Sequence, residues 1–342
     1  MAELLINGAF SGQRVTGPQR YAVEVSARLV AEHGGRLVVP PRGVSGRAGL
    51  THGWAHLALP LLSARGHLVS LTARSPVLAR RHTLVVHDLF VLEHPEWFSE
   101  KYVRSHAPVL SAQLRTAARL VAVSEPVAGQ LRRLHPEKPV TVAPNAPSDV
   151  FRSPSGEHLP KDVQRLLEEP GVEGFLFAVG SRDPRKNFGR LTAAYSTLPA
   201  AVRSAFPLVI AGGESDVFAT SSVAPAAGVQ WLGYVDDLEL ADLYATATAV
   251  AVPSLAEGFG LPVVEALTAG GRLAVSDIAT LRWVAGTAAR YFDPEDVDDI
   301  ARVLLGMITD PPVQGDPAAV LSRFSWAATA DEIARFALDG TR

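Results

Sequence analysis

Short apolar strands alternate with helices along the whole chain, and this alternation restricts the fold more than any other feature. In the first half, we expect strands at residues 4–6, 83–86 and 120–123, with helices between them. The pattern starts again at residues 175–179 and continues through 207–211. Strands that alternate with helices form parallel sheets covered on both faces. The sequence therefore predicts an α/β protein with two doubly wound parallel-sheet, Rossmann-like domains.

The length of 342 residues allows two domains, and a polar segment rich in Ser and Pro separates the two series of strands. We interpret this segment, residues 148–160, as the linker between domains. The predicted domains are residues 1–155 and 161–325, followed by a C-terminal helix in 326–342. Residues 41–66 contain much Gly, Arg and His, and we predict a mobile region there.

Composition excludes several classes of protein. The chain has no cysteine, so disulfides, thiolate metal sites and a cysteine nucleophile are excluded. No basic-then-apolar signal segment opens the sequence, and no apolar run approaches the roughly 20 residues of a membrane span. A cytoplasmic location is the default expectation.

Charge is distributed unevenly. Residues 1–150 hold 17 Lys and Arg against 10 Asp and Glu, whereas the remainder holds 15 against 25. The basic half could meet an anionic acceptor or act as a peripheral contact at the inner face of a membrane. The alternative, favoured because the basic residues are scattered, is two domains that attract each other. Nucleic acid is not expected as a partner, because no basic run with interleaved aromatics occurs.

Residues 249–271 form a strand, a loop of small residues and an apolar helix. We expect the helix to begin at Pro262, with Glu265 in its first turn. Glycines let a backbone approach a ligand closely, helix N-termini bind phosphate or sugar oxygens, and carboxylates such as Glu257 accept hydrogen bonds from adjacent hydroxyls. The stretch therefore suits a polyol ligand as well as the alternative, in which Glu265 complements the helix dipole and Glu257 is solvated.

This stretch resembles the signature of the retaining glycosyltransferases of family 4, which have the GT-B fold. The signature is a Glu, seven residues and a second Glu, with Gly-Phe-Gly-Leu-Pro after the first. The matching positions here are Glu257, Gly258, Phe259, Gly260, Leu261, Pro262 and Glu265. The resemblance implies that Glu257 lies by the donor sugar and that Glu265 binds the ribose hydroxyls.

Further segments match the same family. In the loop after residues 175–179, Lys186 matches the family's diphosphate-binding Lys, and either Arg182 or Arg185 matches its Arg. The resemblance implies further donor contacts at Gly17, Gly180 and the segment Gly233, Tyr234 and Val235. It also implies that His87 lies near the donor sugar and the acceptor. The family's C-terminal helix often crosses back onto the first domain, which we expect for residues 326–342.

The resemblance implies an enzyme that moves a hexose from a nucleoside-diphosphate sugar to a glycan, glycolipid or small-molecule acceptor, with retention of configuration. No cofactor or metal is implied. The Asp-x-Asp match at Asp296 and Asp298 is interpreted as acidic residues at a helix start. Departures from the family pattern at Arg272 and Trp283 leave open a non-catalytic nucleotide-sugar-binding subunit of another transferase. An epimerase of the same fold is a third possibility, which the match to the transferase signature disfavours.

Overall fold

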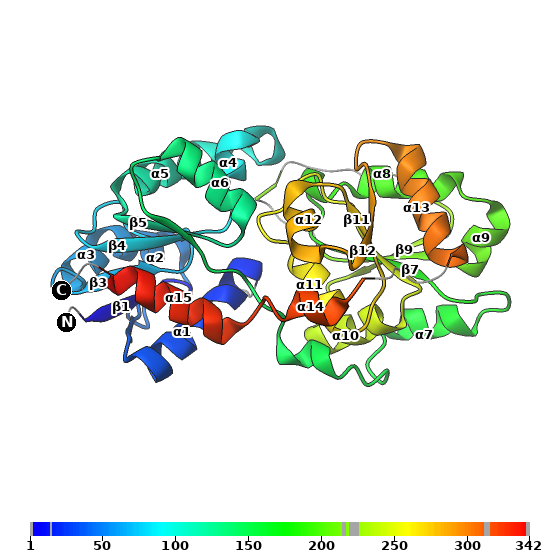
Figure 1. The fold of residues 1–342 in the computed structure, drawn as a ribbon, viewed down its shortest axis with the longest axis horizontal. Helices are drawn as coiled ribbons and strands as arrows, with labels where there is room; N and C mark the ends of the chain where they lie inside the picture. Colours follow the sequence, from blue (N-terminus) through cyan, green and yellow to red (C-terminus); the bar gives the residue numbers. More distant parts are fainter. Residues whose placement is uncertain (1–2, 14–15, 214–216, 219–225, 311–314, 340–342) are drawn as a thin grey trace. The chain divides into compact units, whose positions relative to one another are not determined.

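The chain forms two compact units in the computed structural model, which describes residues 3–13, 16–213, 217–218, 226–310 and 315–339. Unit 1 contains Met1–Pro95, Glu100–Ala146 and Phe324–Arg342, and unit 2 contains Glu96–Ser99 and Pro147–Arg323. Figure 1 labels the helices and strands of both units. Each unit is described by itself below.

Unit 1 is built on a six-stranded parallel sheet in the order β2-β1-β3-β4-β5-β6. The strands are β1 (Leu4–Asn7), β2 (Arg36–Val38), β3 (His67–Ser70), β4 (His82–Val86), β5 (Arg119–Ala122) and β6 (Val140–Val142). Its helices are α1 (Gly17–His33), α2 (Ala48–Leu57), α3 (Leu59–Leu62), α4 (Phe90–Glu93), α5 (Glu100–Thr116), α6 (Glu125–Leu134) and α15 (Trp326–Leu338). The 3-10 helix η1 (Pro95–Trp97) lies where the chain passes briefly into unit 2.

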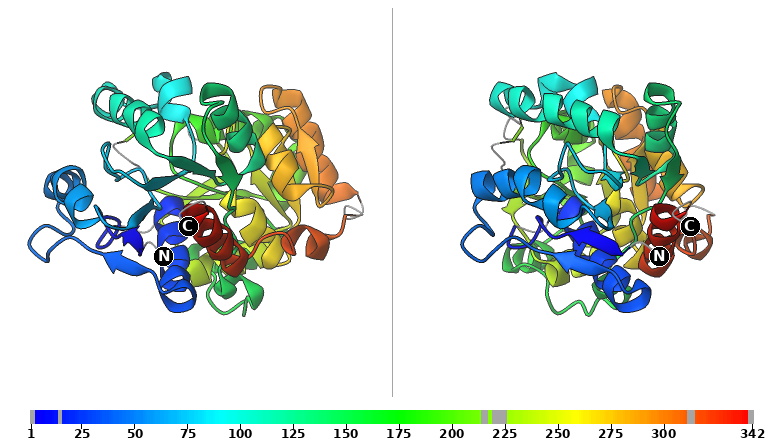
Figure 2. Two further views of the ribbon diagram at one scale, coloured as in Figure 1. Left: turned by 60° about the vertical axis from the view of Figure 1, so that its left-hand side comes forward. Right: turned by 90° about the vertical axis from the view of Figure 1, so that its left-hand side faces the viewer.

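Helix α15 joins unit 1 although it comes from the end of the chain. It packs against α1, and the views of Figure 2 show the red α15 beside the blue α1. Tyr21 of α1 is fully buried, contacts the ring of Trp326 edge-on, and donates its hydroxyl to the carbonyl of Ala143. Thr329 of α15 donates to the carbonyl of Pro144. Burial of these aromatic rings therefore fixes the last helix to the first.

Two histidines lie inside the sheet of unit 1. His67 on β3 bonds through Nε2 to the hydroxyl of Thr83 at 2.8 Å, and His82 on β4 bonds through Nε2 to the hydroxyl of Ser70 at 2.9 Å. Both side chains are buried, and each Nδ1 has no hydrogen-bond partner among the described residues. Burial lowers the pKa of His67 to about 4 and that of His82 to about 3. Both rings are therefore neutral in the folded protein at neutral pH.

Unit 2 repeats the same architecture, with the strand order β12-β11-β10-β7-β8-β9, all parallel. The strands are β7 (Leu176–Val179), β8 (Leu208–Ala211), β9 (Val229–Gly233), β10 (Ala249–Val252), β11 (Leu273–Ser276) and β12 (Ala289–Phe292). Its helices are α7 (Lys161–Glu168), α8 (Phe188–Thr197), α9 (Ala200–Ala205), α10 (Asp237–Thr246), α11 (Leu261–Thr268), α12 (Ala279–Ala285), α13 (Val297–Thr309) and α14 (Pro317–Leu321). The 3-10 helices are η2 (Asp149–Arg152) and η3 (Pro184–Lys186).

Strand β7 shows how the sheet of unit 2 is covered on both faces. Successive side chains of a strand point to opposite faces. Leu176 belongs to the cluster that contains Leu191 of α8 and Leu304 of α13. Phe177 instead contacts the ring of Tyr244 of α10 at 5.7 Å. The predicted pair of doubly wound sheets is therefore confirmed.

Two expectations for irregular segments are wrong. Residues 41–66, expected to be mobile, contain α2 and α3. The expected linker, residues 148–160, lies within unit 2, where Phe151 of η2 is fully buried against Tyr244. The buried carboxylate of Asp242 accepts the backbone N–H of His158 at 2.7 Å and holds the segment on α10. The polar composition of residues 148–160 gave no sign that Phe151 and the Asp242 carboxylate attach this segment to unit 2.

Candidate functional site

The loop between β7 and α8 is built to hold two cations in place. Asp183 caps η3 by accepting the backbone N–H of Lys186, and the hydroxyl of Ser181 donates to the same carboxylate. Arg185 lies 3.5 Å from Asp183. The loop therefore positions the Arg185 and Lys186 side chains just before the start of α8.

Asn187 directly precedes α8 but does not cap it with its side chain. Its backbone is left-handed, with φ of 57°, and its side chain makes no capping bond. The side-chain amide instead donates to the carbonyls of Pro253 at 3.0 Å and Pro294 at 2.7 Å. Asn tolerates this backbone region better than most residues. Asn187 thus links the loop between β7 and α8, here called the cation loop, to the loops after β10 and β12.

Glu257 is the side chain on which the cations converge. Lys186 Nζ lies 2.6 Å from Glu257 Oε1, and an Arg185 terminal nitrogen lies 3.4 Å from Oε2. The hydroxyl of Ser254 also donates to Oε1 at 2.7 Å. Glu257 is only 8% exposed. Burial alone would raise its pKa, but the charges of Lys186 and Arg185 and these hydrogen bonds outweigh burial and lower it. Glu257 is therefore ionised at neutral pH.

Glu265 lies one residue deeper in α11 than expected. The helix begins at Leu261, one residue before the expected start, and its first turn contains no acidic residue. The buried carboxylate of Glu265 accepts a hydrogen bond of 3.3 Å from the hydroxyl of Tyr244. This placement removes the simple explanation in which Glu265 complements the helix dipole from the first turn.

Two glycines allow the loops at the carboxyl edge of the sheet to approach closely. A Cβ on Gly212, after β8, would lie 1.7 Å from the carbonyl oxygen of Gly180, after β7. Gly260 has φ of 95°, and a Cβ there would lie 2.7 Å from Leu281. Gly258 and Phe259 between the two glutamates are buried, and Phe259 packs edge-on against Trp283. Trp283, a departure from the family pattern, thus packs against the loop through Phe259.

The other expected donor contacts of unit 2 lie beside β9. Gly233 ends this strand with φ of 73°, Tyr234 follows with 68% of its side chain exposed, and Val235 is half-buried. Arg182 stacks over the ring of Trp231 at 4.2 Å, whereas Arg185 reaches Glu257. The two arginines that could match the family pattern therefore have different neighbours.

Gly17 and His87 belong to unit 1. Gly17 is the first residue of α1. His87 follows β4, its ring meets Tyr21 edge-on at 5.1 Å, and its Nε2 bonds to the carbonyl of Leu71 at 2.9 Å. Burial lowers the pKa of His87, and the bond to Leu71 and the charge of Asp88 offset only part of that effect. Since a carbonyl only accepts, Nε2 carries the proton and Nδ1 is the acceptor of the neutral ring.

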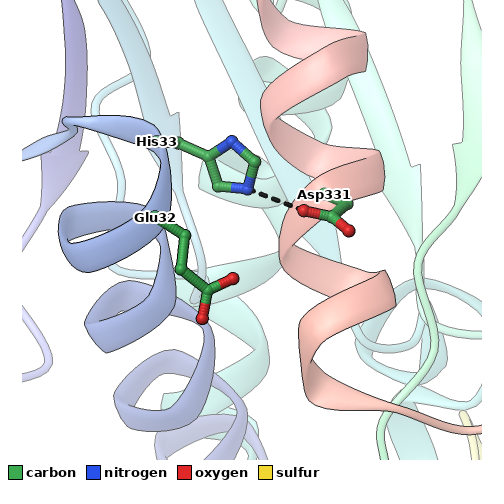
Figure 3. A group of neighbouring side chains, drawn as sticks. All are labelled: Glu32, His33 and Asp331. Carbon is green, nitrogen blue, oxygen red and sulfur yellow. Dashed lines mark hydrogen bonds and ion pairs between the residues drawn. The ribbon is translucent and has the colours of Figure 1, made fainter.

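Two groups that resemble metal ligands serve structural roles. Asp296 caps α13, its carboxylate accepting the backbone N–H groups of Asp298 and Asp299, so the Asp-x-Asp match is a helix cap. Among the described residues, Glu32, His33 and Asp331 form a cluster with ligand atoms within 4.8 Å. Figure 3 shows His33 of α1 turned toward Asp331 of α15, at 2.9 Å. This surface pair links the two helices.

Comparison with known proteins identifies the family. A family model described as glycosyl transferases group 1 matches residues 162–319. The chain is 31% identical over 243 residues to O-antigen chain mannosyltransferase B of Escherichia coli. Residues 162–319 belong to the group 1 glycosyltransferases. The family expected from the sequence is thereby confirmed.

The match to this mannosyltransferase covers 69% of the present chain and 63% of that protein, so the chain spans less than two thirds of the relative. Solved structures show the GT-B fold over nearly the whole length of the chain. Sucrose-phosphate synthase from Thermosynechococcus elongatus has a TM-score of 0.70 at 18% identity and covers 98% of each chain. HepE of Anabaena, solved with UDP and glucose, has a TM-score of 0.69 at 15% identity and covers 99% of this chain and 100% of HepE.

Ser254, Tyr244 and Asn187 were not predicted as site residues. Ser254 and Tyr244 bond to the two signature glutamates, and Asn187 fixes the cation loop. Ser254 could have been found from its place at the end of a buried strand, three residues before Glu257. Tyr244 lies on a different helix, and its sequence position gives no signal.

Proposed function

We propose that the chain transfers a hexose from a nucleoside-diphosphate sugar to a hydroxyl of a glycan, glycolipid or small-molecule acceptor. The observation that carries this proposal is the contact between Lys186 and Glu257, which brings a diphosphate-binding cation and a sugar-binding carboxylate together at the carboxyl edge of a parallel sheet. Ligands of doubly wound sheets bind at this edge. In the proposed site Glu265 holds the ribose, and Gly233, Tyr234 and Val235 line the nucleobase.

The proposed chemistry is displacement at the anomeric carbon. The bond from this carbon to the diphosphate oxygen breaks, and its electron pair leaves with the nucleoside diphosphate. The acceptor oxygen forms the new bond on the same face, so that configuration is retained, and its proton passes to the departing diphosphate. Lys186, an arginine of the same loop and the backbone N–H groups at the start of α11 stabilise the developing negative charge. These fixed charges take the role that a metal ion has in other transferases.

His87 is proposed to position the sugar or the acceptor. Its ring is neutral, and its Nδ1 can accept a hydrogen bond from a hydroxyl while Nε2 is held by Leu71. The proposed role is therefore orientation by a hydrogen bond.

A mannose-like donor is proposed because the relative with 31% identity is a mannosyltransferase. A thermal-shift screen against GDP-, UDP- and dTDP-sugars tests both donor and base. A ligand that binds only the folded state at 100 times its Kd stabilises by about 2.7 kcal/mol. The expected result is a shift of about 5 °C or more with one nucleotide sugar. No shift with any of these ligands would contradict the proposed donor site.

Replacing Glu265 with alanine is expected to weaken binding of that nucleotide by about ten-fold to a hundred-fold, the worth of hydrogen bonds to a charged group. Isothermal titration calorimetry measures the change. Because the alanine leaves the buried Tyr244 hydroxyl without this acceptor, Glu265→Gln is measured alongside it. Glu168→Ala, at the exposed end of α7, is the matched control. Unchanged nucleotide affinity in Glu265→Ala would contradict the proposal that Glu265 holds the ribose.

A non-catalytic nucleotide-sugar-binding subunit would give the same thermal shift but no turnover. Release of nucleoside diphosphate from the stabilising sugar nucleotide, by slow hydrolysis or by transfer, distinguishes the two, because a binding subunit releases none. We expect release. The departures that suggested this alternative have structural explanations, since Trp283 packs on Phe259 and Arg272 lies against the carbonyl of Asp310.

A further inference from the structure

Helices α2 and α3 form one nearly continuous helical stretch over residues 48–62 of unit 1 (Figure 1). Ala58 between them is in the right-handed helical region, and its N–H bonds to the carbonyl of Trp54 at 3.0 Å. The N–H of Leu62 in turn bonds to the carbonyl of Ala58 at 3.0 Å. Pro60 interrupts the ladder only because it has no N–H. Side-chain positions can therefore be compared along one helical axis.

One side of this stretch packs inward. Ala55 and Leu59 are fully buried, and Leu59 belongs to a cluster with Leu5 of β1 and Leu68 of β3. Residues four apart lie on the same side of a helix. This apolar side accounts for how the stretch is attached to its unit.

The opposite side is also apolar, but it is exposed. Leu50, Leu57 and Leu61 are 51%, 76% and 79% exposed. Their spacings of seven and eleven residues are close to two and three helical turns, so the three side chains line one face. We call these three residues the leucine face. Apart from the side that carries His52 and His56, the stretch is apolar, and an exposed apolar helix face of this kind typically marks an interaction surface.

Positive charge surrounds the leucine face. Between Glu32 and Asp88 the sequence contains seven arginines and no Asp or Glu. Arg42 and Arg47 precede α2, Arg65 follows α3, and all three are exposed. Within the ranges that the structure describes, no carboxylate forms an ion pair with any of these three arginines. Their charge is therefore available to an anionic partner.

We propose that the leucine face and its bordering arginines dock unit 1 on the surface of a bilayer that contains anionic lipids. A surface-lying helix inserts an apolar face at the headgroup boundary while basic side chains meet the lipid phosphates. No helix in the described part of the chain is long and apolar enough to cross a membrane, so the contact is a surface contact. This docking goes beyond glycosyl transfer and does not depend on it.

A second copy of the chain is the weaker explanation for the same surface. A symmetric dimer places the same patch on both sides of the interface. Arg47 and Arg65 of one copy would then approach those of the other with no carboxylate between residues 33 and 87 to separate them. An anionic lipid surface offers the complementary charge instead.

Vesicle flotation with the full chain tests the proposal. We expect binding to vesicles of phosphatidylglycerol and phosphatidylcholine in equal parts, and little binding to phosphatidylcholine alone. The double variant Leu57→Glu/Leu61→Glu should bind at least about a hundred-fold more weakly, since burying a leucine side chain is worth about ten-fold or more in affinity. Leu134→Glu, at the exposed end of α6 in the same unit, is the matched control and should bind as the wild type does.

A second vesicle-binding experiment tests the contribution of the arginines that border the leucine face. Arg47→Glu/Arg65→Glu should bind mixed vesicles at least about ten-fold more weakly, and added salt should weaken wild-type binding. Thermal unfolding checks that each variant is folded. Wild-type protein that does not float with mixed vesicles would overturn the proposal, as would equal binding by the leucine variant. A wild-type dimer in sedimentation that Leu57→Glu/Leu61→Glu converts to monomer would assign the face to self-association instead.

Discussion

Replacing Lys186 with alanine should reduce the rate of glycosyl transfer by about a thousand-fold, the upper range for loss of one preorganised group that stabilises a developing anion. The Lys186 ammonium is paired with Glu257 at 2.6 Å, and the residue is only 9% exposed. The alanine removes a charge assigned to the diphosphate and also loosens the carboxylate assigned to the sugar. Release of nucleoside diphosphate from the donor found by thermal shift measures the rate.

Controls separate this effect from unfolding. Lys161→Ala removes the same group from the exposed start of α7 in the same unit, and its rate should be unchanged. Glu257 keeps Arg185 and Ser254 as partners in Lys186→Ala, so the variant should remain folded, which thermal unfolding checks. A folded Lys186→Ala variant with wild-type turnover would refute the proposed donor site.

Acidification from pH 6.5 to about 4.5 should destabilise unit 1 by up to about 5 kcal/mol through His67 and His82, at about 1.4 kcal/mol per pH unit for each ring. Folding lowers both pKa values, to about 4 for His67 and about 3 for His82. Above pH 6.5 both rings are neutral in the folded and the unfolded chain, and the effect is absent. As the pH falls further, only the unfolded chain takes up protons, so stability is lost toward the folded pKa values.

Amide hydrogen exchange as a function of pH resolves the two units. Protection of β3 and β4, corrected for the intrinsic exchange rate, should fall across this window. Unit 2 contains a single histidine, His158, which is exposed, so its strands serve as an internal reference. The lowered pKa of Glu257 affects stability only below its usual value of 4.5, outside this range. The double variant His67→Gln/His82→Gln should lose most of this dependence and keep the part that comes from His87, whose pKa burial also lowers. An unchanged slope would rule out the two rings as its cause.

The fold was largely predictable because its signals are local. Each core strand is a short apolar run that ends in a loop, and Glu257 and Glu265 lie close together in one strand–loop–helix segment. The α2–α3 stretch was missed because its glycines and histidines hid leucines that are spaced on one face. The segment around Phe151 was missed because burial of one ring against Tyr244 is a contact between residues far apart in sequence.

The geometry of the candidate site was less predictable than its composition. The charged residues of the β7–α8 loop were visible, but the pairing of Lys186 with Glu257 depends on how two loops of neighbouring strands meet. The amide of Asn187 holds these loops together by donating to two carbonyls. Side-chain chemistry permits this role, but the position of Asn187 in the sequence does not indicate it. The helix start at Leu261 followed from Gly260, whose left-handed backbone ends the loop one residue earlier than Pro262 suggested.

The contacts of Glu257 have a consequence for how strongly the cation loop attracts small anions. Lys186 and Arg185 face Glu257 and Asp183, so the four formal charges cancel. A neutral group of this kind exerts little long-range pull on abundant ions such as inorganic phosphate. If the proposed donor site is right, a molecule binds here only by bringing hydroxyls for the carboxylate together with oxygens for the cations, and we expect that requirement to favour an intact sugar nucleotide over either of its halves.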